Sequence, residues 1–92
     1  MSKKPEWLAD GVGYVDITLS KPALFNGVSQ SVLRMREPTV GDQEAASVMN
    51  GSDASREITV FANLCEILPD DIRKLPLREY KRLQTAYMAF ID

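Results

Sequence analysis

The chain contains few side chains that could carry out chemistry. Asp70 and Asp71 are adjacent carboxylates, the residue type that serves as a general acid or base, and Cys65 is the single thiol. Adjacent side chains on a turn diverge, so the two aspartates are expected to be helix-terminal and solvated charges and not a catalytic pair. Cys65 has no histidine partner, because the sequence contains no histidine, and it is expected to be a small buried apolar residue.

Two further motifs are equally weak. Gly11-Val12-Gly13 lacks the remainder of a dinucleotide-binding fingerprint and precedes a strand, whereas such a motif follows one. A basic group lies farther along the chain: Arg73, Lys74, Arg78, Lys81 and Arg82. Three acidic residues reduce the net charge of residues 70–82 to +2, which favours a solvated helix face over a site for an acidic partner. The sequence therefore predicts no catalytic, metal-binding or cofactor-binding residue, and no enzyme.

The composition fits one small globular domain with a thin core. Of the 92 residues, 45% are hydrophobic and 26% are charged, which is not the composition of a disordered chain. The net charge of −2 gives no basic footprint for nucleic acid. No apolar run reaches the length of a signal peptide or of a membrane helix, and a lone cysteine suits a reducing compartment. A soluble cytoplasmic protein without nucleic-acid or membrane partners is expected.

Three apolar residues are candidates for partner binding. Residues 1–13 show neither helical nor strand periodicity and are predicted to form a flexible leader, in which Trp7 is either an incidental exposed residue or a docking anchor. Leu24 and Phe25 stand at the tip of a predicted hairpin, where apolar residues are unusual. They either pack against the helices or contact a partner, and the sequence favours neither alternative.

A β-hairpin is predicted for residues 14–36. Residues 14–19 alternate between apolar and polar side chains, and a second strand over residues 28–36 follows Asn26-Gly27, a dipeptide suited to a tight turn. An uninterrupted two-residue hairpin would place apolar residues opposite arginines. A one-residue shift, with a bulge near Pro22, joins the two apolar faces. It pairs Leu19 with Leu33, Ile17 with Met35 and Asp16 with Arg36.

Three helices are predicted after the hairpin. The first covers residues 40–49 with Thr39 as its N-cap and Asp42 completing a capping box. Ser52 and Asp53 are candidate N-caps of the second helix, which is closed by Pro69. Residues 70–75 form either a connecting turn or one helical turn, and the third helix covers residues 76–91. The apolar side of the third helix is expected to contain Leu77, Tyr80, Leu83, Gln84, Tyr87, Met88 and Ile91. The expected fold class is α+β, with an N-terminal hairpin, bulged near Pro22, followed by three α-helices packed on it in one domain spanning residues 14–92.

The pattern as a whole resembles a known family. The strand Ile17-Thr18-Leu19, the glycine-containing turn, and the junction Leu33-Arg34-Met35-Arg36-Glu37-Pro38-Thr39-Val40-Gly41-Asp42 are similar to the tail assembly chaperones of contractile-tailed bacteriophages. Glu57-Ile58-Thr59-Val60-Phe61-Ala62-Asn63-Leu64, Leu68-Pro69-Asp70-Asp71-Ile72 and Leu75-Pro76-Leu77-Arg78-Glu79-Tyr80 look like the helical half of that family.

The resemblance implies a non-enzymatic assembly factor in the host cytoplasm. Such a chaperone holds the long helical tape measure protein soluble, helps tail tube protein polymerise around it, and is not expected in the mature virion. Many members have a longer form made by ribosomal frameshifting, and a chain ending at Asp92 fits the short form. The alternative is a small structural tail or baseplate component retained in the virion. The open edge of the hairpin also makes self-association credible.

Overall fold

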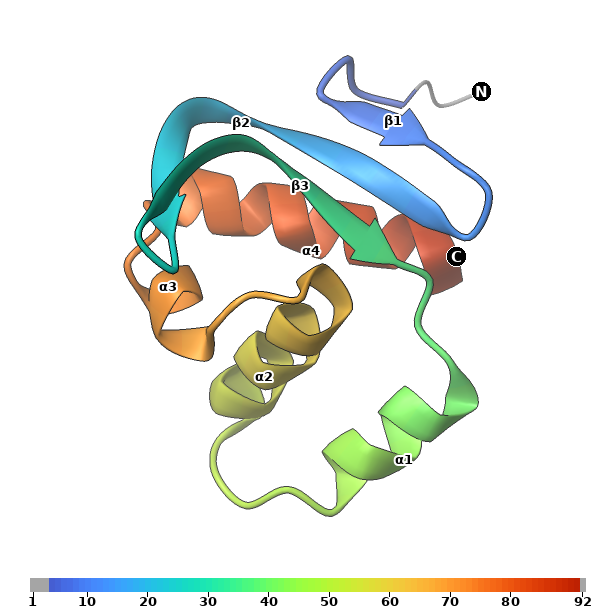
Figure 1. Cartoon of the computed structure of the whole chain (residues 1–92). Coiled ribbons are helices and arrows are strands. Elements are labelled where there is room, and N and C mark those ends of the chain that lie inside the picture. Colours follow the sequence, from blue (N-terminus) through green and yellow to red (C-terminus); the bar gives the residue numbers. More distant parts are fainter. Residues whose placement is uncertain (1–3, 92) are drawn as a thin grey trace.

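The sheet and the helices form two layers. The computed structural model describes residues 4–91 and contains β1 (Leu8–Asp10), β2 (Tyr14–Phe25), β3 (Val28–Arg36), α1 (Val40–Ser47), α2 (Asp53–Cys65), α3 (Pro69–Arg73) and α4 (Leu77–Ile91). The sheet is antiparallel with strand order β1-β2-β3. Helix α2 packs against β3 and α4 packs against β2, while α1 lies beside α2, away from the sheet (Figure 1). The predicted α+β class is confirmed, and α2 and α4 cover the apolar face of the hairpin; α1 was also expected to pack on the hairpin but lies beside α2 instead.

The core lies between the sheet and helices α2, α3 and α4. Its buried members are Leu8, Val15, Ile17, Leu19, Phe25, Leu33, Met35, Phe61, Ala62, Leu64, Cys65, Ile72, Leu83 and Ala86. The rings of Tyr80 and Tyr87 flank Phe61, with centroid distances of 5.7 and 5.4 Å, so both tyrosines serve packing. No helix within residues 4–91 combines the length and apolarity required to span a membrane.

Part of the predicted leader is a strand of the sheet. Leu8 pairs with Ile17 and is buried, and the strand extends to Asp10 opposite Val15. The expectation that the segment has no regular structure is therefore wrong for β1, because a three-residue strand is too short to show periodicity. Residues 1–3 of the expected leader lie outside the described residues.

The bulge near Pro22 is confirmed, but the predicted register is wrong. Asn26 and Gly27 both have positive φ angles, 53° and 78°, as the tight turn requires. Phe25 pairs with Val28 beside this turn, and the register changes between Thr18 and Ala23. Beyond the irregularity the pairs are Ile17 with Leu33, Val15 with Met35 and Asp16 with Arg34. The shift is three residues where one was expected, and both shifts bring the same faces together because side chains alternate with a period of two.

The helical half contains a fourth, short helix. Helix α2 ends at Cys65 because Glu66 adopts a left-handed conformation, with φ of 56°, and the Ile67 N–H returns to the Ala62 carbonyl, 3.0 Å away. Pro69 therefore begins α3 and does not close the second helix, as the sequence analysis expected. Helix α4 starts one residue later than expected, at Leu77.

The buried face of α4 is rotated relative to the expected one. Glu79, Leu83 and Ala86 are its buried residues, while Leu77, Met88 and Ile91 are more than half exposed. Glu79 is a charged residue of this buried face, which the apolar pattern of the helix did not indicate. The rotation leaves several large apolar side chains of α4 on the surface.

Candidate functional site

The three residues that the sequence suggested for partner binding differ in how deeply they are buried. Trp7 is half-buried, and its carbonyl accepts a hydrogen bond from the Thr18 N–H at 2.8 Å. Leu24 is 64% exposed, whereas Phe25 is only 1% exposed. Phe25 therefore belongs to the core, and its assignment as a partner-binding residue is corrected. Partner binding by Trp7 and Leu24 stays a prediction.

The adjacent aspartates diverge, as expected. Asp70 pairs with Arg73 at 2.9 Å on the surface of α3. Asp71 accepts a hydrogen bond from the Asn26 N–H at 2.7 Å and so attaches the hairpin turn to α3. The role of Asp71 in fixing the turn was not foreseen, because the contact joins residues that are 45 positions apart.

Cys65 is a buried apolar residue, as expected. It is 8% exposed, and burial raises the pKa of its thiol to about 12, which disfavours the reactive thiolate. Within residues 4–91, no group of three or more histidine, cysteine, aspartate or glutamate side chains is arranged to hold a metal ion. Cys65 is therefore a structural residue of the core.

Glu79 holds the irregular segment of β2. Its carboxylate accepts hydrogen bonds from the Ser20 N–H at 3.0 Å, the Lys21 N–H at 3.3 Å and the Ser20 hydroxyl. Burial favours the neutral acid, but these hydrogen bonds and the nearby Arg82 together outweigh it and hold the pKa of Glu79 below its ordinary value. The residue satisfies backbone donors that the bulge removes from the strand ladder.

Arg82 lies one helical turn after Glu79 and attaches α4 to β2 at Thr18, where the irregular segment begins. It donates to the Thr18 carbonyl at 2.5 Å, and its guanidinium carbon lies 4.9 Å from the centre of the Trp7 ring. Its side chain also lies 4.0 Å from the Glu79 carboxylate. Arg82 is therefore a structural residue, which corrects its assignment to a solvated basic face.

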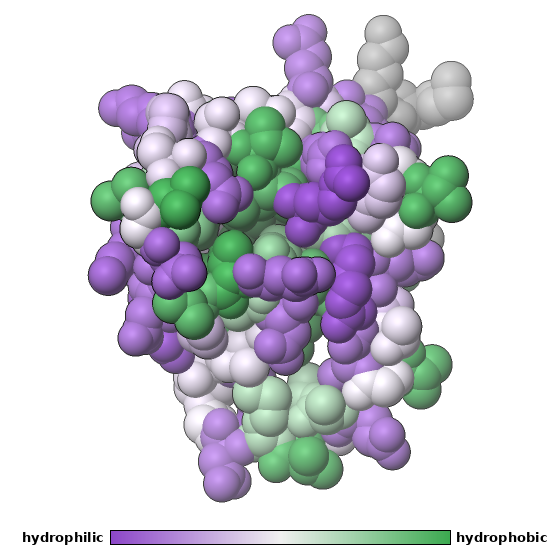
Figure 2. Space-filling view, viewed as in Figure 1, coloured by the Kyte–Doolittle hydropathy of each residue, from purple (hydrophilic) through white to green (hydrophobic). Residues whose placement is uncertain are grey.

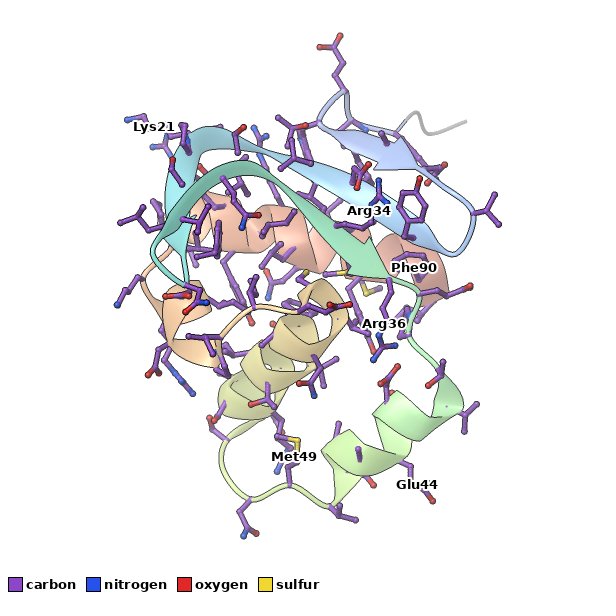
Figure 3. All side chains as sticks on the ribbon, in the orientation of Figure 1. Lys21, Arg34, Arg36, Glu44, Met49 and Phe90 are labelled. Atoms are coloured by element: carbon purple, nitrogen blue, oxygen red, sulfur yellow. The ribbon has the colours of Figure 1, made fainter. Side chains whose placement is uncertain are left out.

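Helix α1 is held at its ends by polar contacts. Arg36 extends from the end of β3 toward α1 (Figure 3) and makes two hydrogen bonds with Asp42, at 2.8 and 2.9 Å. Asp42 also completes the predicted capping box with Thr39. At the other end, Arg56 donates to the Met49 carbonyl at 3.2 Å. Because α1 has no buried residue, these contacts fix its position.

Acid is expected to destabilise the fold through Asp42 and Glu79. Hydrogen bonds from Arg36 and Thr39 lower the pKa of Asp42, and the pKa of Glu79 is also lowered. A carboxylate with a lowered folded-state pKa contributes stability above its unfolded-state pKa and loses it as the pH falls toward the folded-state value. The free energy of unfolding in urea should be constant from about pH 7 to 5 and fall below about pH 5.

The variant Asp42→Asn tests this assignment. It removes one titrating carboxylate, so the free energy of unfolding should depend less steeply on pH below about 5 than in the wild-type chain. An unchanged acid dependence in this variant would contradict the role given to Asp42.

An apolar pocket lies where α2, α3 and α4 meet. We call it the Leu77 pocket. It encloses about 250 Å³ and is lined by Ile58, Ile72, Arg73, Leu75, Leu77 and Tyr80. Leu77 is 68% exposed at its mouth. The Tyr80 hydroxyl donates to Glu57 at 2.5 Å, and burial together with Glu57 raises the tyrosine pKa, so the lining stays uncharged at this residue.

Three basic residues are close in the sequence to residues that line this pocket. Lys81 lies one turn after Leu77 on the same side of α4, and Lys74 and Arg78 flank the lining residues in the sequence. All three are exposed, and none forms an ion pair with another described residue. The arrangement can accept an apolar side chain whose neighbours carry negative charge.

A second hollow separates α1 from α2 and α4. It encloses about 260 Å³ and is lined by Gln43, Ala46, Ser47, Arg56, Glu57, Val60, Phe61 and Tyr87. On the face shown in Figure 2, apolar and polar side chains are interspersed, with an apolar cluster at the end formed by α1 and the following turn. The Leu77 pocket is the better candidate for docking, because the second hollow carries polar side chains from both walls.

Comparisons with known proteins identify the family. A family model described as phage tail assembly chaperone proteins, E, or 41 or 14, matches residues 16–92. No curated protein and no solved structure matches the chain. The match begins within β2 and covers all of β3 and the helices, including every residue of the Leu77 pocket. The chain therefore belongs to the phage tail assembly chaperone family.

Proposed function

We propose that the chain is a non-enzymatic chaperone that keeps the tape measure protein soluble and assists polymerisation of the tail tube around it. It acts in the cytoplasm of the infected host and is absent from the mature virion. Membership of the family implies interaction with tail proteins. The resemblance described above implies the specific partners, namely the tape measure protein and the tail tube protein. It also implies a frameshifted longer form.

The Leu77 pocket is the observation that carries this proposal. A helical client presents apolar side chains along one stripe, and a groove with an apolar floor binds such a stripe by burying one or more of them. A single fully buried leucine or phenylalanine contributes about 1.5–3 kcal/mol, which suits a complex that must later come apart. Lys74 and Lys81 favour a client segment with acidic residues beside its apolar anchor.

Co-expression tests the proposed function directly. The tape measure protein encoded beside this chain is produced with and without it, and the soluble fraction is measured after centrifugation. The proposal predicts that the tape measure protein is mostly insoluble alone and mostly soluble with the chain. Equal solubility in both cases, with the short and the extended forms, would contradict it.

Replacement of Leu77 by aspartate should abolish this solubilisation without unfolding the chain. The side chain is 68% exposed, so its loss costs little core packing, and a carboxylate in the first turn of α4 interacts favourably with the helix dipole. Burying a charge against an apolar client residue is unfavourable, so binding should weaken by at least about tenfold, or 1.4 kcal/mol. Pull-down of the tape measure protein measures this loss.

Val48→Asp is the matched control. Val48 is 79% exposed and lies at the C-terminal end of α1, outside the Leu77 pocket. This variant should bind the tape measure protein as the wild type does. If Leu77→Asp also binds normally while solubilisation persists, the chaperone function stands and the assignment of the pocket is wrong.

A further inference from the structure

β3 is an edge strand of the sheet. β3 is nine residues long and pairs only with β2, so no other described strand satisfies the backbone groups on its far side. Natural edge strands are usually protected by proline, lysine, a bulge or a covering segment. β3 contains neither proline nor lysine, and the extra residues at the irregularity belong to β2. The edge can therefore accept another strand.

The two charged residues of β3 do not guard this edge. Arg34 lies across the sheet toward β2 (Figure 3), where it makes hydrogen bonds with Asp16 at 2.9 and 3.1 Å and stacks on Tyr14. Arg36 is engaged with Asp42 of α1. The remainder of β3, residues 28–33, carries no charge, and Val32 is 45% exposed.

Unfilled space lies beside β3. Two hollows of about 460 and 500 Å³ border the strand, and they share Gln30 and Glu66. Their β3 residues range from Val28 to Arg36, and α2 with the turn after it forms the other side. None of these residues lines the Leu77 pocket, so the edge is separate from the proposed client site.

We propose that two copies of the chain associate by antiparallel pairing of their β3 edges. The pairing is two-fold symmetric about Val32, the middle residue of the strand, and joins the two sheets into one of six strands. Alternate residues of an edge strand present both backbone groups outward, so a nine-residue strand supplies about four such residues per copy. This inference goes beyond the proposed function and does not depend on the client.

The side chains of β3 favour a second copy in this register. With full overlap of the two strands, Val32 faces Val32, Arg34 faces Gln30 and Arg36 faces Val28 of the other copy. The arginines of the two copies are therefore never directly opposite one another, and the exposed valines meet at the axis. On the inner face, Leu33 and Met35 lie opposite Ser31 and Ser29, which are small and exposed in the single chain.

Sedimentation across a concentration series tests the dimer. The wild-type chain should shift from monomer to dimer as its concentration rises. Val32→Lys places two like charges at the axis and removes the valine contact, so the dimer dissociation constant should rise by at least about tenfold. Thr18→Lys is the control, because Thr18 pairs with Val32 on the same face but lies one strand farther from the axis, and its dimer should persist.

Cysteine cross-linking tests the register independently of these lysines. Val32→Cys should form a covalent dimer under mild oxidation, whereas Gln30→Cys should not, because Gln30 faces Arg34 of the other copy. Cys65 is buried and should not react. A wild-type chain that stays monomeric at about 1 mM, or equal cross-linking of the two variants, overturns the proposal.

Discussion

Replacing Phe25 with alanine is expected to lower the free energy of unfolding by about 3–5 kcal/mol. Phe25 is among the largest fully buried side chains, and its loss leaves a cavity between the hairpin tip and the turn that links α2 to α3. A 92-residue domain has a total stability of about 5–14 kcal/mol, so this single change removes a large part of it. Urea denaturation monitored by circular dichroism measures the change.

Leu24→Ala is the matched control for Phe25→Ala. The two residues are adjacent, but Leu24 is 64% exposed, so its truncation should alter the free energy of unfolding by no more than about 0.5 kcal/mol. Equal effects of the two substitutions would contradict the placement of Phe25 beneath the hairpin tip.

Glu79→Ala is expected to lower the free energy of unfolding by about 2–4 kcal/mol. The substitution leaves the amides of Ser20 and Lys21 without their acceptor at a part-buried position, and the loss of such a hydrogen bond to a charged acceptor costs about 1–3 kcal/mol. It also removes the acidic neighbour of Arg82. Chemical denaturation at neutral pH measures the loss, and Glu79→Gln should lose less, because its amide oxygen still accepts a hydrogen bond.

Glu44→Ala is the matched control, because it makes the same substitution at an exposed glutamate. Glu44 points into solvent from α1 (Figure 3) and is exposed. Its replacement should change the free energy of unfolding by less than about 0.5 kcal/mol. If Glu79→Ala behaves in the same way, Glu79 does not hold the irregular segment of β2.

The register of the hairpin shows what sequence reasoning could and could not determine. Alternation of apolar residues determines only which faces come together, so it required an odd shift and placed an irregularity near Pro22 correctly. The size of the shift depends on Glu79, which satisfies the amides of Ser20 and Lys21 from a distant helix. Nothing local in β2 indicates this acceptor. The predicted Asp16–Arg36 pair failed for the same reason, and Asp16 pairs with Arg34.

The Leu77 pocket could be predicted only in part. Leu77 and Tyr80 were assigned to the apolar side of the last helix, and both line the pocket. The pocket exists because α2 ends early at a left-handed Glu66 and the short helix α3 brings Ile72 into the lining. Glutamate seldom adopts a left-handed backbone conformation, so the amino-acid sequence does not indicate that the chain turns at Glu66. The rotation of α4 then leaves Leu77 exposed.

Strand β1 and the contacts of Trp7 were missed for a different reason. A three-residue strand next to glycines carries no periodic signal, and its position is set by pairing with β2 and by Arg82. Residue types a few positions apart in the sequence correctly predicted the capping box of Thr39 and Asp42 and the Asn26-Gly27 turn. Local motifs were thus predictable, and contacts between distant residues were not.

Quantitative mass spectrometry of finished tails and of assembly intermediates distinguishes a chaperone that leaves from a structural protein that stays. A chaperone that leaves after the tail tube has formed should be abundant in complexes containing the tape measure protein before tube completion. The chain is expected to be absent from purified finished particles. Its retention there in a fixed ratio to other tail proteins would rule out the chaperone function and indicate a structural component of the tail or baseplate.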